Sequence, residues 1–223
     1  ALYFGHAGNQ GHAVLWGEQI NASAMHMSGY QGHGSVATPH GVLITWALMM
    51  EGGIQVNEQG LRFSNENQGY SEQSVHVLAQ SNKVAWVIYD EKLHLLGKEF
   101  PDYLKAINSG AIKSAENATS LIELIGVDRK GFEETLCLIE DFSLSKKVDP
   151  FGREFKRNLA PSEKMYAIKV TGALFHTQGG LLVNEKAQVL KSDNTPFKNL
   201  FAGGGAACGV SGPDVSGYLS GNG

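Results

Sequence analysis

The chain has few cysteines, no excess of positive charge and no long apolar run. Its two cysteines, Cys137 and Cys208, have no histidine or second cysteine at a zinc-binding spacing, so we expect reduced thiols and no metal site. A formal charge of −4 and a pI near 6.1 provide no basic stripe for nucleic acid. No apolar run reaches the roughly 18 residues that cross a bilayer, and the first residues lack the charged start of a signal peptide. We therefore expect a soluble, cytoplasmic protein without nucleic-acid or membrane partners.

Glycine is abundant, with 28 of the 223 residues. It gathers at 29–34, 52–53, 179–180, 203–212 and 217–223 rather than being spread evenly. Glycine is used where φ must be positive or where the backbone must approach a ligand closely. Because these clusters interrupt apolar segments, they indicate turns or ligand-facing loops and not a flexible linker.

The first two thirds of the chain predict a mixed, helix-rich lobe. Apolar periodicity and turn residues indicate helices, a hairpin and a strand within it. Ser114 or Asn117 is the expected N-cap of a helix within 99–147. The predicted elements are an amphipathic helix within 9–27, a buried segment at 42–50, a hairpin over 54–64, a short helix at 71–80, a buried strand at 84–89 and helices within 99–147.

The last third predicts strands and turns. Strands are expected at 166–170, 180–184, 188–190 and 199–202, and the last of them runs directly into three glycines, 203–205. A buried strand that leads into a glycine loop can offer backbone amides to a ligand, although this pattern alone is a weak indication.

Six motifs, in their order and spacing, resemble those of the fumarate reductase and succinate dehydrogenase flavoproteins. They are Gln31-Gly32-His33, Val42-Leu43-Ile44-Thr45, Gly52-Gly53-Ile54-Gln55-Val56-Asn57, Gly60-Leu61-Arg62-Phe63-Ser64-Asn65-Glu66, His176-Thr177-Gln178-Gly179-Gly180 and Asn199-Leu200-Phe201-Ala202-Gly203-Gly204. The resemblance covers almost the whole chain and implies an α+β fold. It implies a helix-rich substrate-capping domain with a small sheet at 28–176, and flavin-domain segments at 1–27 and 177–223.

One family feature is not found in this sequence. The family holds the FAD pyrophosphate with a G-x-G-x-x-G turn between a strand and a helix, and no such turn occurs here. The resemblance therefore implies a piece of a longer, FAD-dependent parent whose other part carries most of the FAD site. The expected partners are a small-molecule substrate and the remainder of the FAD domain, and exposed flavin-domain surface would favour self-association.

The resemblance also assigns candidate site residues. His33 and His176 stand where the family has two substrate-binding histidines, Thr45 matches a substrate-binding hydroxyl, and Tyr70 stands where fumarate reductases have a proton-donating arginine. Tyr70 can equally be an ordinary loop tyrosine. A lone loop histidine can be a surface or capped residue, but two histidines that bracket the same domain at family positions favour the substrate-binding role. In the family, hydride passes between a substrate C–C bond and the flavin while a cap residue transfers the matching proton.

Departures from the family pattern bear on the substrate. Neither Tyr70 nor the segment 212–216 supplies the arginines that clamp a substrate carboxylate, and Trp46 and Met49 replace a glutamate and an arginine of the proton path. A ketone-activated substrate, as in the related ketosteroid dehydrogenases, suits Tyr70 and Tyr218 better than fumarate or succinate does.

The glycines of the last motifs are candidate FAD contacts. The positions are Gly179, Gly180, Gly203, Gly204 and Gly205, and the last of these replaces a glutamate common in the family. Tight turns between strands would also explain them. Arg62 and Glu66 are expected to anchor the cap rather than to react.

Two alternatives remain open. The chain could be a non-catalytic binding module derived from the cap, which the absent arginines and the absent first glycine motif favour. It could also be part of a carboxylate reductase that uses Arg153 or Arg157, although charged stretches such as 153–157 are usually solvated faces.

Overall fold

The computed structural model describes residues 2–215, which form two compact units. Unit 1 comprises Gly34–Gly172 together with Leu2, and unit 2 comprises Tyr3–His33 and residues 173–215. Each boundary falls inside a strand, because β3 (Tyr30–Ala37) and β8 (Met165–Thr177) both contribute residues to the two units. The assignment of 28–176 to a substrate-capping domain stays a prediction.

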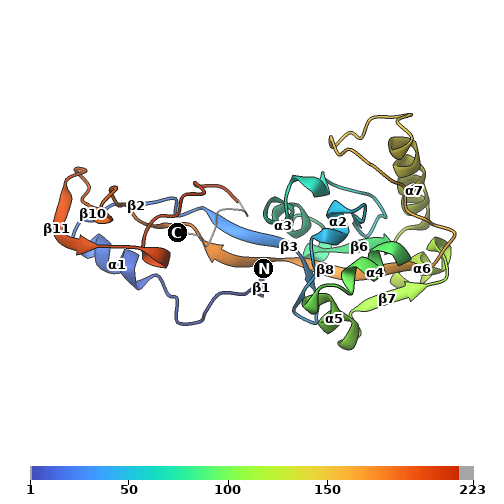
Figure 1. The fold of residues 1–223 in the computed structure, drawn as a ribbon, viewed down its shortest axis with the longest axis horizontal. Helices are drawn as coiled ribbons and strands as arrows, with labels where there is room; N and C mark the ends of the chain where they lie inside the picture. Colours follow the sequence, from blue (N-terminus) through green and yellow to red (C-terminus); the bar gives the residue numbers. More distant parts are fainter. Residues whose placement is uncertain (1, 216–223) are drawn as a thin grey trace. The chain divides into compact units, whose positions relative to one another are not determined.

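The core of unit 1 is built on an antiparallel sheet with the strand order β4-β3-β8-β6-β5. Figure 1 labels β3, β6, β7 and β8 of this sheet. The longest pairing joins β6 (Val84–Asp90) to β8, from Val84 opposite Thr171 to Asp90 opposite Met165. The other strands are β1 (Leu2–Tyr3), β4 (Val42–Leu43), β5 (Ile54–Val56) and β7 (Ile112–Ala115), of which β1 and β7 pair with β8.

Three helices of unit 1, α4, α6 and α7, begin at side chains that accept backbone hydrogen bonds. Asp90 caps α4 at Leu93 N (3.3 Å), Asn117 caps α6 at Ser120 N (2.9 Å) and Asp128 caps α7 at Gly131 N (2.8 Å). Their apolar faces join the strands in one buried core. The helices are α2 (Ala47–Met50), α3 (Tyr70–Leu78), α4 (Glu91–Gly97), α5 (Pro101–Asn108), α6 (Ala118–Ile125) and α7 (Arg129–Ser143).

Unit 2 is smaller and has more turns than helix. Helix α1 (His12–Gln19) lies beside a two-stranded pairing of β2 (Ala24–Met25) with β9 (Gly180–Leu181). A second pair joins β10 (Gln188–Leu190) to β11 (Pro196–Phe201), which precedes the glycine turn at Gly204–Ala206. Within residues 2–215, no helix is both long and apolar enough to span a membrane.

Most of the predicted elements are confirmed. Helix α3, strand β6, the helices within 99–147 and the cap at Asn117 are found, whereas Ser114 lies in β7. The helix expected within 9–27 is limited to α1, and the buried segment 42–50 divides into β4 and α2. That segment ends at the surface, since Met50 is 54% exposed.

The hairpin predicted over 54–64 is wrong. Strand β5 pairs antiparallel with β6, about thirty residues further along the chain, and residues 61–63 form no strand. The turn itself exists, because Asn57 Oδ1 accepts hydrogen bonds from the N–H groups of Gln59 and Leu61 (both 3.1 Å). Beyond it the chain departs from the sheet because Arg62 is bound by buried carboxylates, as described below.

Candidate flavoprotein site

His33 lies in β3 and is buried, with 8% of its surface exposed. Its imidazole lies against the ring of Phe175, with 5.8 Å between the centroids. Burial disfavours the charged form and lowers the pKa of His33 from 6.5 to about 4. The side chain is therefore a neutral imidazole near pH 7, with one N–H donor and one acceptor nitrogen.

His176 is exposed near the end of β8 and lines a pocket of about 410 Å³ within unit 2. Phe175 stacks on Phe4 at 4.8 Å and forms part of the wall, so a rigid aromatic pair precedes the histidine. Gly204 and Gly205 form another part of the wall. Both predicted histidines thus belong to unit 2 and flank Phe175, one buried and one accessible.

A second pocket of unit 2, of about 550 Å³, lies at the start of α1. Residues 8–15 supply much of its lining, and Gly179, Gly205 and Ala206 are among the other lining residues. Gly205 lines both pockets, so the glycine turn separates two hollows of one unit.

The five predicted flavin-contact glycines divide into two groups. A Cβ on Gly179 would lie 2.7 Å from Met27 Cα, and one on Gly180 would lie 2.3 Å from the Ala207 carbonyl carbon, so chain packing requires both. A Cβ on Gly203, Gly204 or Gly205 would meet nothing within 4 Å. Gly204 and Gly205 therefore present open backbone to the pockets, whereas Gly203 lines neither of them, and the first N–H groups of such a turn have no partner within it. This arrangement fits contact with a flat cofactor.

Thr45 and Tyr70 belong to unit 1. Thr45 Oγ1 accepts a hydrogen bond from Ala47 N (3.3 Å) at the start of α2, which is a local structural role. Tyr70 is the first residue of α3 and is partly exposed. Met49 is fully buried and Trp46 packs against the core. Methionine and tryptophan do not titrate, so neither position can take part in a proton path.

Arg62 and Glu66 form a buried ion cluster with Asp149 and Arg153. Arg62 Nη2 lies 2.7 Å from Glu66 Oε2, and Arg62 Nη1 lies 2.8 Å from Asp149 Oδ1. Arg153 Nη1 lies 3.1 Å from Glu66 Oε2. This geometry supports an anchoring role for Arg62 and Glu66.

The expectation that 153–157 is a solvated face holds for Glu154 and Lys156, which are exposed, but is wrong for the residues between and beside them. Arg153 is 5% exposed and Phe155 is 8% exposed, because Glu66 and core side chains receive them. Arg157 is ion-paired with Asp90. Both arginines are thus engaged within unit 1, which weighs against their use in a carboxylate reductase.

Gln178 is a site residue that the sequence did not single out. It is 3% exposed, lines the pocket beside His176, and has an amide nitrogen without a hydrogen-bond partner. Its backbone connects two segments, donating to Gly29 O and accepting from Gly209 N (both 2.8 Å). The residue lies inside the His176–Gly180 motif, but only the structure shows that its amide is buried.

Tyr218, the candidate residue within 216–223, lies outside the described residues. Among residues 2–215, no group of histidine, cysteine and carboxylate side chains has the arrangement of a metal site.

Comparison with known proteins identifies the family. The model of the family described as "FAD binding domain" matches residues 5–217. A fumarate reductase (cytochrome) of Shewanella frigidimarina is 29% identical over 87% of this chain and 34% of its own length. A 4-oxocyclohexanecarboxylate 2-dehydrogenase of Sinomonas cyclohexanicum is 29% identical over 75% of this chain and 33% of its own length.

A solved structure gives the same result. The open conformation of a flavocytochrome c3 fumarate reductase matches 95% of this chain and 36% of its own, with a TM-score of 0.70 and 28% identity. The chain therefore spans about a third of the length of the relatives it matches. It has the mixed helix and sheet fold of this group, and it belongs to the FAD binding domain family, the fumarate-reductase-like flavoprotein oxidoreductases whose cofactor is FAD.

Proposed function

We propose that this chain is part of an FAD-dependent dehydrogenase or reductase that acts on a CH–CH bond next to a ketone. The observation that carries the proposal is the burial of His33, which lowers its pKa to about 4 and so favours the neutral imidazole. A neutral imidazole offers a hydrogen bond to a carbonyl oxygen, but it does not offer the positive charge that best holds a carboxylate. The family position therefore suits a ketone better than a dicarboxylate.

The remaining proposed roles concern this chain's own residues. His33 would orient the substrate carbonyl and stabilise negative charge that develops on its oxygen. His176, exposed beside the pocket, would bind a second polar group of the substrate, and Thr45 would assist. Tyr70 would transfer the proton, since its hydroxyl is the donor present where fumarate reductases have arginine.

FAD, when bound, supplies the hydride chemistry. The open backbone of Gly203–Gly205 would lie against the cofactor, and the buried amide nitrogen of Gln178 would donate to one of its polar atoms. The pyrophosphate would be held by the remainder of the FAD domain. Without that part, we expect this chain alone to bind FAD weakly.

The relatives are compatible with more than one substrate class. One is named for fumarate, a dicarboxylate, and another for a 4-oxocyclohexanecarboxylate, which carries a ketone and a carboxylate. Both are 29% identical to this chain, over 87% of it for the first and 75% for the second, so percent identity alone does not favour either class. The neutral His33 and the absence of arginine at position 70 favour the ketone.

The test uses the full-length parent with its FAD. Its visible spectrum is recorded anaerobically while saturated cyclic ketones or succinate are added. Bleaching of the flavin bands by a ketone, and not by succinate, is the expected result. His33→Leu should abolish bleaching while retaining the flavin spectrum, and His40→Leu, at an exposed histidine, is the matched control. Bleaching by succinate alone would refute the ketone assignment, and a parent without flavin would leave the binding module as the better account.

A further inference from the structure

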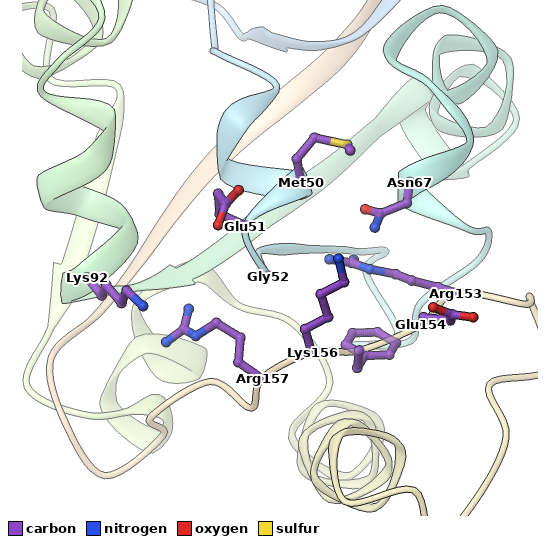
Figure 2. A pocket seen from close by; sticks show the side chains of 10 residues that line it. Met50, Glu51, Gly52, Asn67, Lys92, Arg153, Glu154, Lys156 and Arg157 are labelled. Carbon is purple, nitrogen blue, oxygen red and sulfur yellow. The ribbon is translucent and has the colours of Figure 1, made fainter.

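A polar pocket of about 390 Å³ lies within unit 1 and shares no residue with the candidate flavin site (Figure 2). Its wall combines the end of α2 and the following turn with α4 and the stretch after α7. The charged or polar side chains of the lining are Glu51, Asn67, Lys92, Arg153, Glu154, Lys156 and Arg157.

Two of the four cations are fixed by the protein. Arg153 donates from Nη1 to Gly53 O (2.9 Å) and from Nη2 to Met49 O (2.8 Å), in addition to its pairing with Glu66. Arg157 is held by its ion pair with Asp90. These contacts preorganise two guanidinium groups at the pocket wall, so a ligand would not have to order them.

Lys92 and Lys156 supply two further positive charges. Both lysines are exposed at the pocket. In Figure 2 the charged ends of Lys92 and Arg157 point toward one another, whereas the carboxylate of Glu154 is turned the other way. Glu51 also lines the pocket, and its carboxylate would oppose an anion that came close to it.

Two buried polar atoms of the lining have no hydrogen-bond partner. They are the donor Arg153 Nε and the acceptor Asn67 Oδ1. A buried polar group without a partner costs on the order of 1–3 kcal/mol, so such atoms call for an ordered water or a ligand. A donor and an acceptor in the same wall match a molecule that carries an oxyanion and a hydroxyl group.

We propose that this pocket binds a small hydroxylated oxyanion. The oxyanion, a carboxylate or a phosphate, would accept hydrogen bonds from Arg153 Nε, Lys156 and Lys92. The hydroxyl of the ligand would donate to Asn67 Oδ1. The site does not depend on the proposed redox function, because none of its residues belongs to the candidate flavin site.

The test is a two-dimensional amide NMR titration of this chain with malate in one arm and glycerol 3-phosphate in the other, both at constant ionic strength. We expect saturable shifts at Gly52, Asn67 and Lys156, with a dissociation constant in the millimolar range for one arm. Lys156→Gln and Lys92→Gln should each weaken binding about tenfold. Lys113→Gln, at an exposed lysine in β7, is the matched control and should leave binding unchanged.

Each other outcome overturns the proposal. Shifts equal to those given by sodium chloride would mean screening alone. Saturable shifts confined to other residues would place the ligand elsewhere. Absence of saturation in both arms would mean that ordered water satisfies Asn67 and Arg153. Binding unaffected by both lysine variants would exclude the assigned contacts.

Discussion

Burial of His33 predicts a pH dependence of stability that can be assigned to one side chain. The pKa of His33 is about 4 in the folded chain, whereas an unperturbed histidine, as in the unfolded chain, has a pKa of 6.5. Between these values the unfolded chain binds a proton that the folded chain does not, so stability falls as the pH falls. For one group with these two pKa values, the free energy of unfolding decreases by roughly 2 kcal/mol between pH 7 and pH 5. Above pH 7 this contribution is fully present.

The assay is urea unfolding of the chain at pH 7 and pH 5, with wild type compared to His33→Gln. The variant should lose most of the difference between the two pH values, because glutamine does not titrate. A small remainder is expected from His94, whose pKa is also lowered, first of all by burial. Titration of the His33 ring protons by NMR is the direct check. A midpoint near 6.5, or an unchanged pH dependence in His33→Gln, would refute the neutral histidine and with it the main support for a ketone substrate.

Three further predictions concern glycines and the ion cluster. Gly60→Ala should cost at least about 3 kcal/mol in urea unfolding, because φ is +73° and the new Cβ would lie 2.4 Å from Phe132 N. Gly110→Ala has the same φ but open space, so it should cost only about 1–2 kcal/mol, and equal losses would contradict the steric argument. Arg62→Met should cost about 3–5 kcal/mol, because buried Asp149 loses its ion pair with Arg62 and buried Glu66 keeps only its pair with Arg153. Arg129→Met, at an exposed pair, should change stability by less than about 1 kcal/mol, a contrast that thermal unfolding also measures. Gly205→Ala should leave this chain's stability within about 0.5 kcal/mol but weaken FAD retention in the parent, and unaltered retention measured by flavin fluorescence would remove Gly205 from the cofactor site.

Local patterns in the sequence were sufficient for elements with a strong local signature. Strand β6 was predictable because its run of β-branched and aromatic residues is typical of a buried strand, and α6 was predictable because Asn117 caps it. The hairpin over 54–64 failed because β5 finds its partner in β6, a choice that depends on the whole sheet. A turn sequence alone cannot decide between a neighbouring and a distant partner strand.

Long-range ion pairs were also out of reach of sequence reasoning. Arg153 and Arg157 were expected to be solvated because they stand in a stretch in which four of five residues are charged. Their partners, Glu66 and Asp90, lie more than sixty residues away along the chain. The same two pairings create the wall of the pocket in unit 1, so the pocket could not be predicted either.

For the candidate site, motif order located the positions and the structure supplied their surroundings. His33 and His176 were equivalent in the sequence, yet one is buried and neutral and the other is exposed. The glycines were equivalent too, yet Gly180 is required by packing and Gly205 faces open space. Residue type and spacing carry no information on burial by distant segments, and burial decides protonation state and steric freedom.

The core at Trp46 and Met49 bears on how a proton would reach the reaction. The family's proton path has a glutamate and an arginine at these positions, whereas here Met49 is fully buried and Trp46 packs against the apolar core. Neither side chain can gain or lose a proton near neutral pH. If Tyr70 is the proton donor, its hydroxyl must therefore exchange with solvent by another path, and its partial exposure at the start of α3 is compatible with direct exchange with water. Restoring the family pair by Trp46→Glu with Met49→Arg would not restore the path, because both charges would enter a packed core and disrupt it.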